Sequence, residues 1–419
     1  MAHATADDSL SDSAPTQAFL VTLVGLTFAM NLIGRGVTET FAVFLLPVQQ
    51  GLGVSRAEIT LTYSVFMLAY GLSAPFAGQL IDRLGARITY GFGLLCLGGG
   101  YFLAGFSGKL WHYCLAVGLM GGLGAASLGM IIASGLISRW FTGRIGWVMS
   151  LPYAAMGAGM LILPPLTQLL LVHFDWRATH RLLGIGVMAI VPLVMLLPLE
   201  RMTRGSQGWR HLRSKSATGA GPWTVATAAR TSAFWGLFVA YLFTSIAAYS
   251  VLPHTVAYLV ERGIDPLVAA SAFGMTGMLS FAGILGVGWA SDVFGRRQTA
   301  TLTYISSMIG VVLLIGVTGW PSLALVYGFT VFFGLMQGAR GPIIVTMVTK
   351  LFPGGGVGTI FGTLSMAMGL GAGIGSWVSG LLYTVTGSYI ASFVLAIAAS
   401  CVGMATFWVV RALREERIA

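Results

Sequence analysis

Apolar stretches long enough to cross a lipid bilayer recur along almost the whole chain. Windows of about twenty apolar residues follow one another from Phe19 to Val410, with only short polar breaks between them. A helix rises about 1.5 Å per residue, so each window can span the roughly 30 Å hydrocarbon core of a membrane. Such a segment must satisfy its backbone hydrogen bonds internally, as a helix does. The sequence therefore predicts an all-α polytopic membrane protein.

Charged residues are scarce and fall mainly between these windows. They make up 9% of the 419 residues, whereas soluble domains contain about 25%. This separation of apolar windows from charged breaks predicts twelve transmembrane spans. The predicted spans are residues 18–47, 58–80, 88–107, 111–138, 146–171, 178–198, 233–260, 266–290, 299–317, 322–349, 357–383 and 389–410.

The basic residues between the spans are unevenly divided between the two membrane faces. With the N-terminus placed inside, sixteen Lys and Arg residues fall on the cytoplasmic side and five on the outer side. Positive residues resist translocation, so this excess predicts that both termini are cytoplasmic. The net charge of +10 then reflects topology, and we expect no nucleic-acid partner. Residues 1–17 lack the basic start of a signal peptide and are predicted to be a disordered cytoplasmic tail.

The sequence also repeats itself after about 210 residues. The segment GQLIDRLGAR at 78–87 returns as GWASDVFGRR at 288–297, an offset of 210. SRWF at 138–141 aligns with TKLF at 349–352, an offset of 211. Such a duplication predicts two parallel six-helix bundles with a binding site between them near the midplane. The expected organisation is a tail at 1–17, a bundle at 18–198, a cytoplasmic linker at 199–232, a bundle at 233–411 and a cytoplasmic tail at 412–419.

The motif Gly-x-x-x-Asp-Arg-x-Gly-x-Arg at 78–87, its weaker copy and the six-plus-six layout resemble the major facilitator superfamily. FAVFLLPVQQGLGVSRAEITLTYSVF at 41–66 and ARGPIIVTMVTKLFPGGGVGTIFG at 339–362 resemble its monocarboxylate-porter branch, which includes oxalate:formate exchangers. The resemblance implies a secondary transporter of a small organic anion, a monocarboxylate, working by alternating access with proton coupling or anion exchange. We expect a monomer in the lipid bilayer of a bacterial inner membrane, without cofactor, bound metal or enzyme activity.

The same resemblance assigns the repeated motif to gating. In the superfamily this loop latches the outward-facing state, so its charged residues are expected to act on the gate and not on the substrate. Gly85 is expected to supply a turn conformation that other residues avoid. The alternative is a turn that only sets topology. The expected gate residues are Asp82, Arg83, Arg87, Asp292 and Arg296.

Three formal charges remain once the loops, tails and span ends are subtracted: Arg35, Glu39 and Arg340. A charge at the bilayer centre is costly unless it is paired or hydrated, so all three are expected to face the cavity between the halves. Arg35 and Glu39 stand four residues apart, which places them on one helical face with Asn31 and Thr38. Three interpretations stay open: a structural ion pair, a coupling proton carried by Glu39, or direct contact between Arg35 and substrate.

Arg340 stands alone on its helix, on one face with Gln337 and Phe333. A buried guanidinium needs an anion, and either Glu39 across the cavity or a bound carboxylate would serve. Two positive charges and one negative charge favour a monoanion, so Arg340 and Gln337 are predicted to bind substrate. Relatives that carry carboxylates commonly place a binding arginine in helix eight, whereas span 266–290 has no basic residue.

His254 follows Pro253, which removes a helical hydrogen bond and predicts a kink. This histidine is predicted to relay protons or to bind substrate, with simple packing as the alternative. Tyr63, Tyr153 and Tyr249 are the hydroxyl groups expected near the cavity, with lipid-facing or interfacial positions as the alternative.

Two other transport functions remain open. A proton-driven exporter of drug-like amphiphiles usually carries a Gly-Pro pattern in helix five, which AAMGAGMLILPP at 154–165 fits only loosely. Met156 and Met160 have a spacing that could offer thioethers to Cu(I), so a copper transporter is the weaker alternative. A receptor or an enzyme is disfavoured because the chain has no catalytic residue set with credible spacing.

Overall fold

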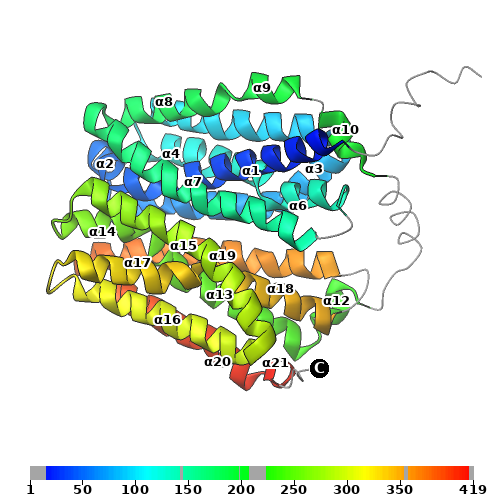
Figure 1. Ribbon diagram of the computed structural model, residues 1–419. Helices are drawn as coiled ribbons and strands as arrows, with labels where there is room; N and C mark the ends of the chain where they lie inside the picture. Colours follow the sequence, from blue (N-terminus) through cyan, green and yellow to red (C-terminus); the bar gives the residue numbers. More distant parts are fainter. Residues whose placement is uncertain (1–15, 142–144, 198, 207–222, 353–356, 415–419) are drawn as a thin grey trace, which may run out of the picture.

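The computed structural model describes residues 16–141, 145–197, 199–206, 223–352 and 357–414. These ranges form helices joined by short connections and contain no strand. Figure 1 shows the helices side by side, with the start of α1 (Gln17–Glu39) and the last helix, α21 (Arg411–Arg414), at the same end of the bundle. We call this the terminal end and the other the opposite end. The predicted tails and the middle of the predicted linker lie largely outside the described residues.

The first half of the chain supplies six spans and a short helix that follows them. Span 1 is divided between α1 and α2, span 4 among four short segments, and span 6 between α8 and α9. After α1 the elements are α2 (Phe41–Leu52), α3 (Arg56–Ala104), α4 (Leu110–Tyr113), the π-helix η2 (Cys114–Met120), α5 (Gly121–Leu128), α6 (Met130–Ser138), α7 (Ile145–His173), α8 (Trp176–Met188), α9 (Val191–Leu196) and α10 (Leu199–Arg204).

The second half repeats this plan. Span 7 is divided by a 3₁₀ turn, and span 10 is divided between α17 and α18. The elements are α12 (Val225–Ala228), α13 (Ser232–Tyr249), η3 (Leu252–His254), α14 (Thr255–Glu261), α15 (Pro266–Phe294), α16 (Arg296–Gly316), α17 (Leu323–Gln337), α18 (Arg340–Leu351), α19 (Val357–Thr386), α20 (Ile390–Val409) and α21.

The twelve predicted spans are confirmed. Within the described ranges, nine helical segments are each long and apolar enough to cross a membrane. Helix α3 adds two spans, because its 49 residues would extend about 74 Å as one straight helix, more than twice the thickness of the hydrocarbon core. Helices α17 and α18 together add the twelfth.

The two parts of α3 run antiparallel. Residues 65–69 pack along 118–122 in the same direction, whereas residues 97–100 pack along 116–124 in the opposite direction. The reversal occurs at Gly85, whose φ of 82° and ψ of 170° lie in a region used almost only by glycine. The sequence predicts a loop between spans 2 and 3, but the helix continues on both sides and only this glycine leaves the helical conformation.

The second copy of the motif repeats the backbone geometry. Gly295, which lies 210 residues after Gly85, has a φ of 84° and a ψ of 149°. Both glycines therefore connect consecutive spans through the same glycine-only conformation. This agreement indicates that the repeat preserves structure as well as sequence.

Spans 1, 4, 7 and 10 are each interrupted. Span 1 breaks at Thr40 and span 7 at Val251, 211 residues later; span 4 breaks at Gly129 and span 10 at Gly338, 209 residues later. In span 7 the break coincides with the kink predicted at Pro253, which lies in η3. Irregular backbone inside a membrane protein is tolerated where it lines a cavity or is buried in protein.

The helix packing shows the same duplication. Helix α1 packs on α7 as α13 packs on α19, and α3 packs on α8 as α16 packs on α20. The two bundles meet where α3 contacts α19 and where α7 contacts α15. The structure is thus two pseudo-symmetric six-helix bundles with a seam between them.

Replacing Gly85 with alanine is expected to destabilise the protein by about 1–3 kcal/mol, since a side chain is disfavoured at this φ and ψ. Thermal unfolding of the purified protein in detergent measures the loss. Gly78→Ala is the control, because its new Cβ would meet only Ile131 Cγ2, at 3.9 Å. Equal stability of the two variants would show that the turn at Gly85 relaxes without cost.

Candidate functional site

A cavity of about 490 Å³ lies between the two bundles. Spans 1, 4, 7 and 10 contribute lining residues from both bundles. Spans 2, 5, 8 and 11 contribute as well, so the wall comes from eight helices. Its polar side chains include Arg35, Tyr70, Ser134, Tyr153, Tyr241, Thr244, Ser245, Tyr249, Ser280, Gln337, Arg340 and Ser365.

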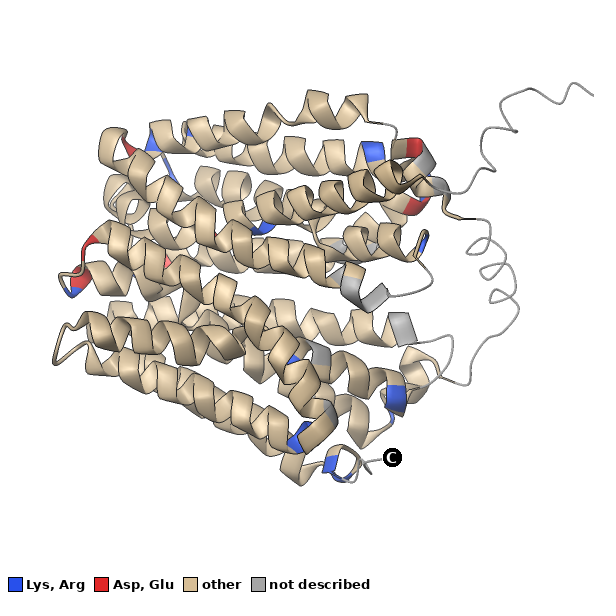
Figure 2. Cartoon of the chain, in the orientation of Figure 1, with Lys and Arg blue, Asp and Glu red and all other residues tan. Residues whose placement is uncertain are grey.

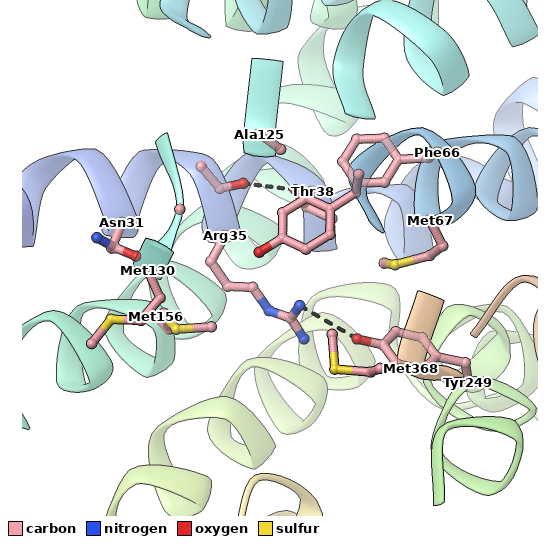
Figure 3. Close-up of a pocket in the computed structure, with 13 residues that line it drawn as sticks. Asn31, Arg35, Thr38, Phe66, Met67, Ala125, Met130, Met156, Tyr249 and Met368 are labelled. Carbon is pink, nitrogen blue, oxygen red and sulfur yellow. Dashed lines mark hydrogen bonds between the residues drawn. The ribbon is translucent and has the colours of Figure 1, made fainter. Parts of the chain in front are cut away.

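A smaller pocket of about 70 Å³ adjoins this cavity and shares part of its wall (Figure 3). Arg35 and Tyr249 line both spaces. Asn31 lines the small pocket, where its Nδ2 donates to the carbonyl of Thr27 at 2.8 Å. Thioethers make much of the remaining surface, which suits an apolar or polarisable group. The methionines of the small pocket are Met67, Met130, Met156 and Met368.

Arg35 and Glu39 form an ion pair beside the cavity, with 2.6 Å between Nη2 and Oε1. Their exposure differs: the Arg35 side chain is 22% exposed and that of Glu39 is 2% exposed. Arg35 Nη1 also donates to the Tyr249 hydroxyl at 3.5 Å, a contact visible in Figure 3. Tyr249 ends α13 in the second half, so this hydrogen bond joins the two bundles at the cavity.

Tyr63 packs between Phe41 and Tyr249, close to this ion pair. It is 2% exposed, and its ring packs 4.9 Å from Phe41 and 6.0 Å from Tyr249. Its hydroxyl has no hydrogen-bond partner in the described part of the chain. Tyr63 and Glu39 are not among the lining residues of either space, although they adjoin residues that are.

Arg340 is held by neutral groups of the neighbouring helix α16. Its Nε donates to Thr303 Oγ1 at 3.2 Å, and its Nη2 donates to the Thr303 carbonyl at 2.7 Å and to Ser307 Oγ at 2.5 Å. The guanidinium lies 4.2 Å from the centroid of the Tyr304 ring. None of its described contacts is with a carboxylate, because Glu39 pairs with Arg35. The Nη1 group has no hydrogen bond among the described residues and is available to a ligand.

Sequence reasoning did not identify the residues that support Arg340. Thr303 and Ser307 are spaced i and i+4 on α16, so they lie on one helical face. That spacing is the only local signal. Their contact with Arg340 depends on the packing of α16 against α17 and α18, which a single sequence does not reveal.

The remaining predicted site residues divide into two groups. Gln337, at the end of α17, and Tyr153, on α7 and 37% exposed, both line the cavity. His254 does not line either space: it is fully buried, and its Nε2 lies 3.2 Å from the Ser376 carbonyl, to which it donates. The structure therefore places His254 outside the cavity that Arg35 and Arg340 line.

The motif residues at the terminal end contact the first bundle and α10. Asp82 Oδ1 accepts a hydrogen bond from Arg139 Nη2 at 2.5 Å. The Nη1 of Arg139 donates to the Thr203 carbonyl at 2.6 Å, and Thr203 Oγ1 accepts from the Ala86 backbone N–H at 2.9 Å. The turn after Gly85 is therefore attached to α10 and to the end of span 4.

The other predicted gate residues have different surroundings. Arg87 pairs with Glu200 of α10 at 3.2 Å, and Arg83 is exposed. Arg296 begins α16, whereas the side chain of Asp292 lies outside the described part of the structure. Figure 2 shows that the charged residues of the described helices gather at the two ends and are sparse between them.

The helix order, the paired bundles and the cavity between them agree with a comparison to known families. A model of the Major Facilitator Superfamily matches residues 24–320 and 282–418. The chain belongs to the major facilitator superfamily. It is an integral membrane transporter of small organic solutes and not an enzyme.

Individual relatives and one solved structure are similar over most of the chain. The chain is 28% identical over 375 residues to monocarboxylate transporter 13 of Bos taurus, covering 88% of this chain and 84% of the relative. It is 25% identical over 383 residues to the uncharacterized MFS-type transporter YcxA of Bacillus subtilis (strain 168), covering 90% and 91%. The crystal structure of a D-xylose-proton symporter matches with a TM-score of 0.73 at 14% identity, covering 96% and 100%, which supports the fold alone.

Replacing Asp82 with asparagine is expected to slow transport by roughly tenfold, about 1.4 kcal/mol, while changing substrate affinity little. The residue contacts Arg139 and does not line the cavity, so we expect the change to act on the conformational equilibrium. Initial uptake rates and equilibrium binding measure the two effects separately. Glu58→Gln is the control, since Glu58 accepts a hydrogen bond from the Ser55 backbone at the start of α3, away from the motif, and an amide can keep that contact. Parallel losses of rate and affinity would remove Asp82 from the gate.

Proposed function

We propose that this transporter moves a small organic anion, a monocarboxylate, by alternating access, with proton coupling or anion exchange. The observation that carries the proposal is the charge of the cavity. Two guanidinium groups line it, and among the described residues only that of Arg35 is paired with a carboxylate. The remaining single positive charge suits one carboxylate group.

Arg340 is the proposed anchor for that carboxylate. It is 4% exposed and surrounded by hydroxyl groups, a carbonyl and an aromatic ring, which orient the guanidinium without neutralising it. The two N–H donors of Nη1 remain for a carboxylate, because Nε and Nη2 already donate to Thr303 and Ser307. A charge-assisted hydrogen bond of this kind is strengthened where water is excluded. Arg340 would thus take the role that relatives give to an arginine in helix eight. Gln337 and Tyr249 line the same cavity and would contact the rest of the substrate.

Glu39 is the proposed carrier of a coupling proton. While its carboxylate is ionised, it engages Arg35. A proton on Glu39 would weaken this pair and leave Arg35 free to attract a second oxygen of the anion. Proton and anion would then bind together with no change in net charge. If the protein is instead an anion exchanger, Arg35 and Glu39 form a permanent structural pair.

The organisation of the molecule in the membrane is part of the same proposal. Residues 18–198 and 233–411 would be the two moving bundles, joined by a linker at 199–232. The terminal end would face the cytoplasm, in agreement with the excess of basic residues there. We place the protein as a monomer in a bacterial inner membrane.

The apolar wall of the cavity favours one second candidate, export of drug-like amphiphiles. Methionine and tyrosine side chains adapt to varied apolar shapes, and Met130, Met156, Met160 and Met368 all line the cavity. Proteoliposomes tested with labelled carboxylates and with a lipophilic cation, each with and without a pH gradient, separate the two candidates. Uptake of carboxylates alone supports the first proposal, and movement of the cation alone overturns it.

Replacing Arg340 with lysine is expected to lower the affinity for the transported carboxylate by about ten- to a hundredfold, or 1.4 to 2.8 kcal/mol. Lysine keeps the charge but loses the planar fork and the hydrogen bond from Nε to Thr303. Calorimetric binding measures the change. Arg297→Lys is the control, because Arg297 lies over Trp408, away from the cavity. Unchanged affinity in Arg340→Lys would remove Arg340 from the binding site.

Replacing Glu39 with glutamine is expected to abolish uphill uptake driven by a pH gradient, because the amide imitates the protonated acid and cannot release a proton. Downhill exchange of the same anion should remain measurable, and binding should lose its dependence on pH. Transport into proteoliposomes under both regimes provides the test. Full pH-driven accumulation by Glu39→Gln would show that the pair with Arg35 is only a structural tie.

A further inference from the structure

The opposite end of the molecule carries an ion pair that joins the two bundles. Arg56, the first residue of α3, lies 2.5 Å from Glu261, the last residue of α14, measured from Nη2 to Oε1. Arg56 is 3% exposed, whereas Glu261 is 28% exposed. One partner comes from span 2 and the other from span 7, so the contact spans the seam between the halves.

Two tyrosines of the second half complete this contact. Arg56 Nη1 donates to the Tyr389 hydroxyl at 2.7 Å, and the Tyr383 hydroxyl donates to Glu261 Oε1 at 3.2 Å. The guanidinium also lies 4.6 Å from the centroid of the Tyr383 ring. We call Arg56, Glu261, Tyr383 and Tyr389 the end cluster. The Arg56 guanidinium thus has an ion pair, a hydrogen bond and a cation–π contact.

The cavity extends away from the end cluster. Several lining residues lie near helix ends at the terminal end: Ser134 is four residues before the end of α6, and Phe361 is four residues after the start of α19. None of the four end-cluster residues lines the cavity. In the described conformation the cavity therefore extends toward the terminal end, and the end cluster lies beyond its lining at the opposite end.

We propose that the end cluster is the gate that closes the transport path at the opposite end, and that Arg56 and Glu261 must separate in each cycle. Movement of one bundle against the other pulls the two residues apart, because each belongs to a different half. Separation leaves the buried guanidinium of Arg56 without its counter-charge, which is costly. The pair therefore stabilises the described conformation relative to the one open at the other face. This inference rests on the two-bundle architecture and not on the identity of the substrate.

The end cluster is not a product of the internal repeat. Offsets of 210 to 212 relate Arg56 to residues 266–268, which are Pro, Leu and Val. The same offsets relate Glu261 to residues 49–51, which are Gln, Gln and Gly. The repeated motif provides charged residues at the terminal end in both halves, whereas the pair of Arg56 and Glu261 has no charged counterpart at the repeat-related positions. In this proposal the gate at the terminal end would use the repeated motif, and the gate at the opposite end would use the ion pair of Arg56 and Glu261.

The gate is tested by the access of a reagent to the cavity, without any substrate. Cys96, Cys114 and Cys401 are the three cysteines of the chain and are first replaced by alanine. Met156→Cys then places one thiol in the wall shared by the cavity and the small pocket. A membrane-impermeant maleimide is added to oriented vesicles at the face opposite the termini. Labelling should be slow with the native end cluster and at least about tenfold faster with Glu261→Gln.

Two further variants make the result specific. Glu58→Gln is the matched control: Glu58 lies two residues from Arg56 but accepts a hydrogen bond from the backbone of Ser55, so labelling should not change. Exchanging the charges with Arg56→Glu and Glu261→Arg should slow the labelling again. An unchanged rate in Glu261→Gln, or an equal acceleration in Glu58→Gln, overturns the proposal.

A cross-link provides an independent reading. The Ala57 backbone N–H donates to Thr384 Oγ1 at 3.1 Å across the same seam, so thiols introduced by Ala57→Cys and Thr384→Cys lie within reach of a short bifunctional cross-linker. Once these are joined, labelling at position 156 should stop from the opposite face and continue from the terminal face. Continued labelling from the opposite face shows that the path does not open here and overturns the gate. Because no step needs a substrate, this failure is distinct from failure of the proposed anion transport.

Discussion

The cost of placing an ionised side chain among apolar helices governs how this molecule is built. Each charge in the membrane region needs a partner or water, and the described structure supplies three different solutions. Arg35 has a carboxylate on its own helix, Arg340 has hydroxyl groups and a ring on α16, and Arg56 has a carboxylate from the other bundle. The first two line the cavity between the bundles, and the third lies at the opposite end, outside the cavity lining. Apolar contacts between helices stabilise the fold. The three arginines lie at the cavity and at the seam where we propose that the two bundles separate.

The regular parts of the fold could be predicted from sequence because each depends on a local signal. Apolar length gave the twelve spans, and the repeat offset gave the two halves, since both properties can be counted along the chain. The interruption of span 1 at Thr40 was not predicted, because Thr40 is an ordinary residue there and the break depends on its surroundings. The near-continuous helix around Gly85 was missed for a related reason: glycine indicates a turn but not how few residues the turn needs.

The candidate site was predictable in part. Scarcity made Arg35, Glu39 and Arg340 conspicuous, and the first two pair as their i,i+4 spacing suggests. The partners of Arg340 come from another helix, so no spacing rule could find Thr303 or Ser307. The wall formed by spans 2, 5, 8 and 11 depends likewise on the tilt of whole helices. The roles of these residues in binding, coupling and gating remain proposals, and His254 shows why position matters: its burial beside Ser376 separates it from the cavity.

The asymmetry between the two ends of the path has a thermodynamic consequence. A contact that holds one conformation changes how long the molecule waits there and how quickly it returns, but it does no net work over a complete cycle. Strengthening or weakening the contact between Arg56 and Glu261 would therefore raise the apparent affinity for solute at one face of the membrane and lower it at the other. The final accumulation ratio would not change, because the solute and ion gradients alone determine it. Such a contact can vary between related proteins to suit supply on one side of a membrane without altering what is carried.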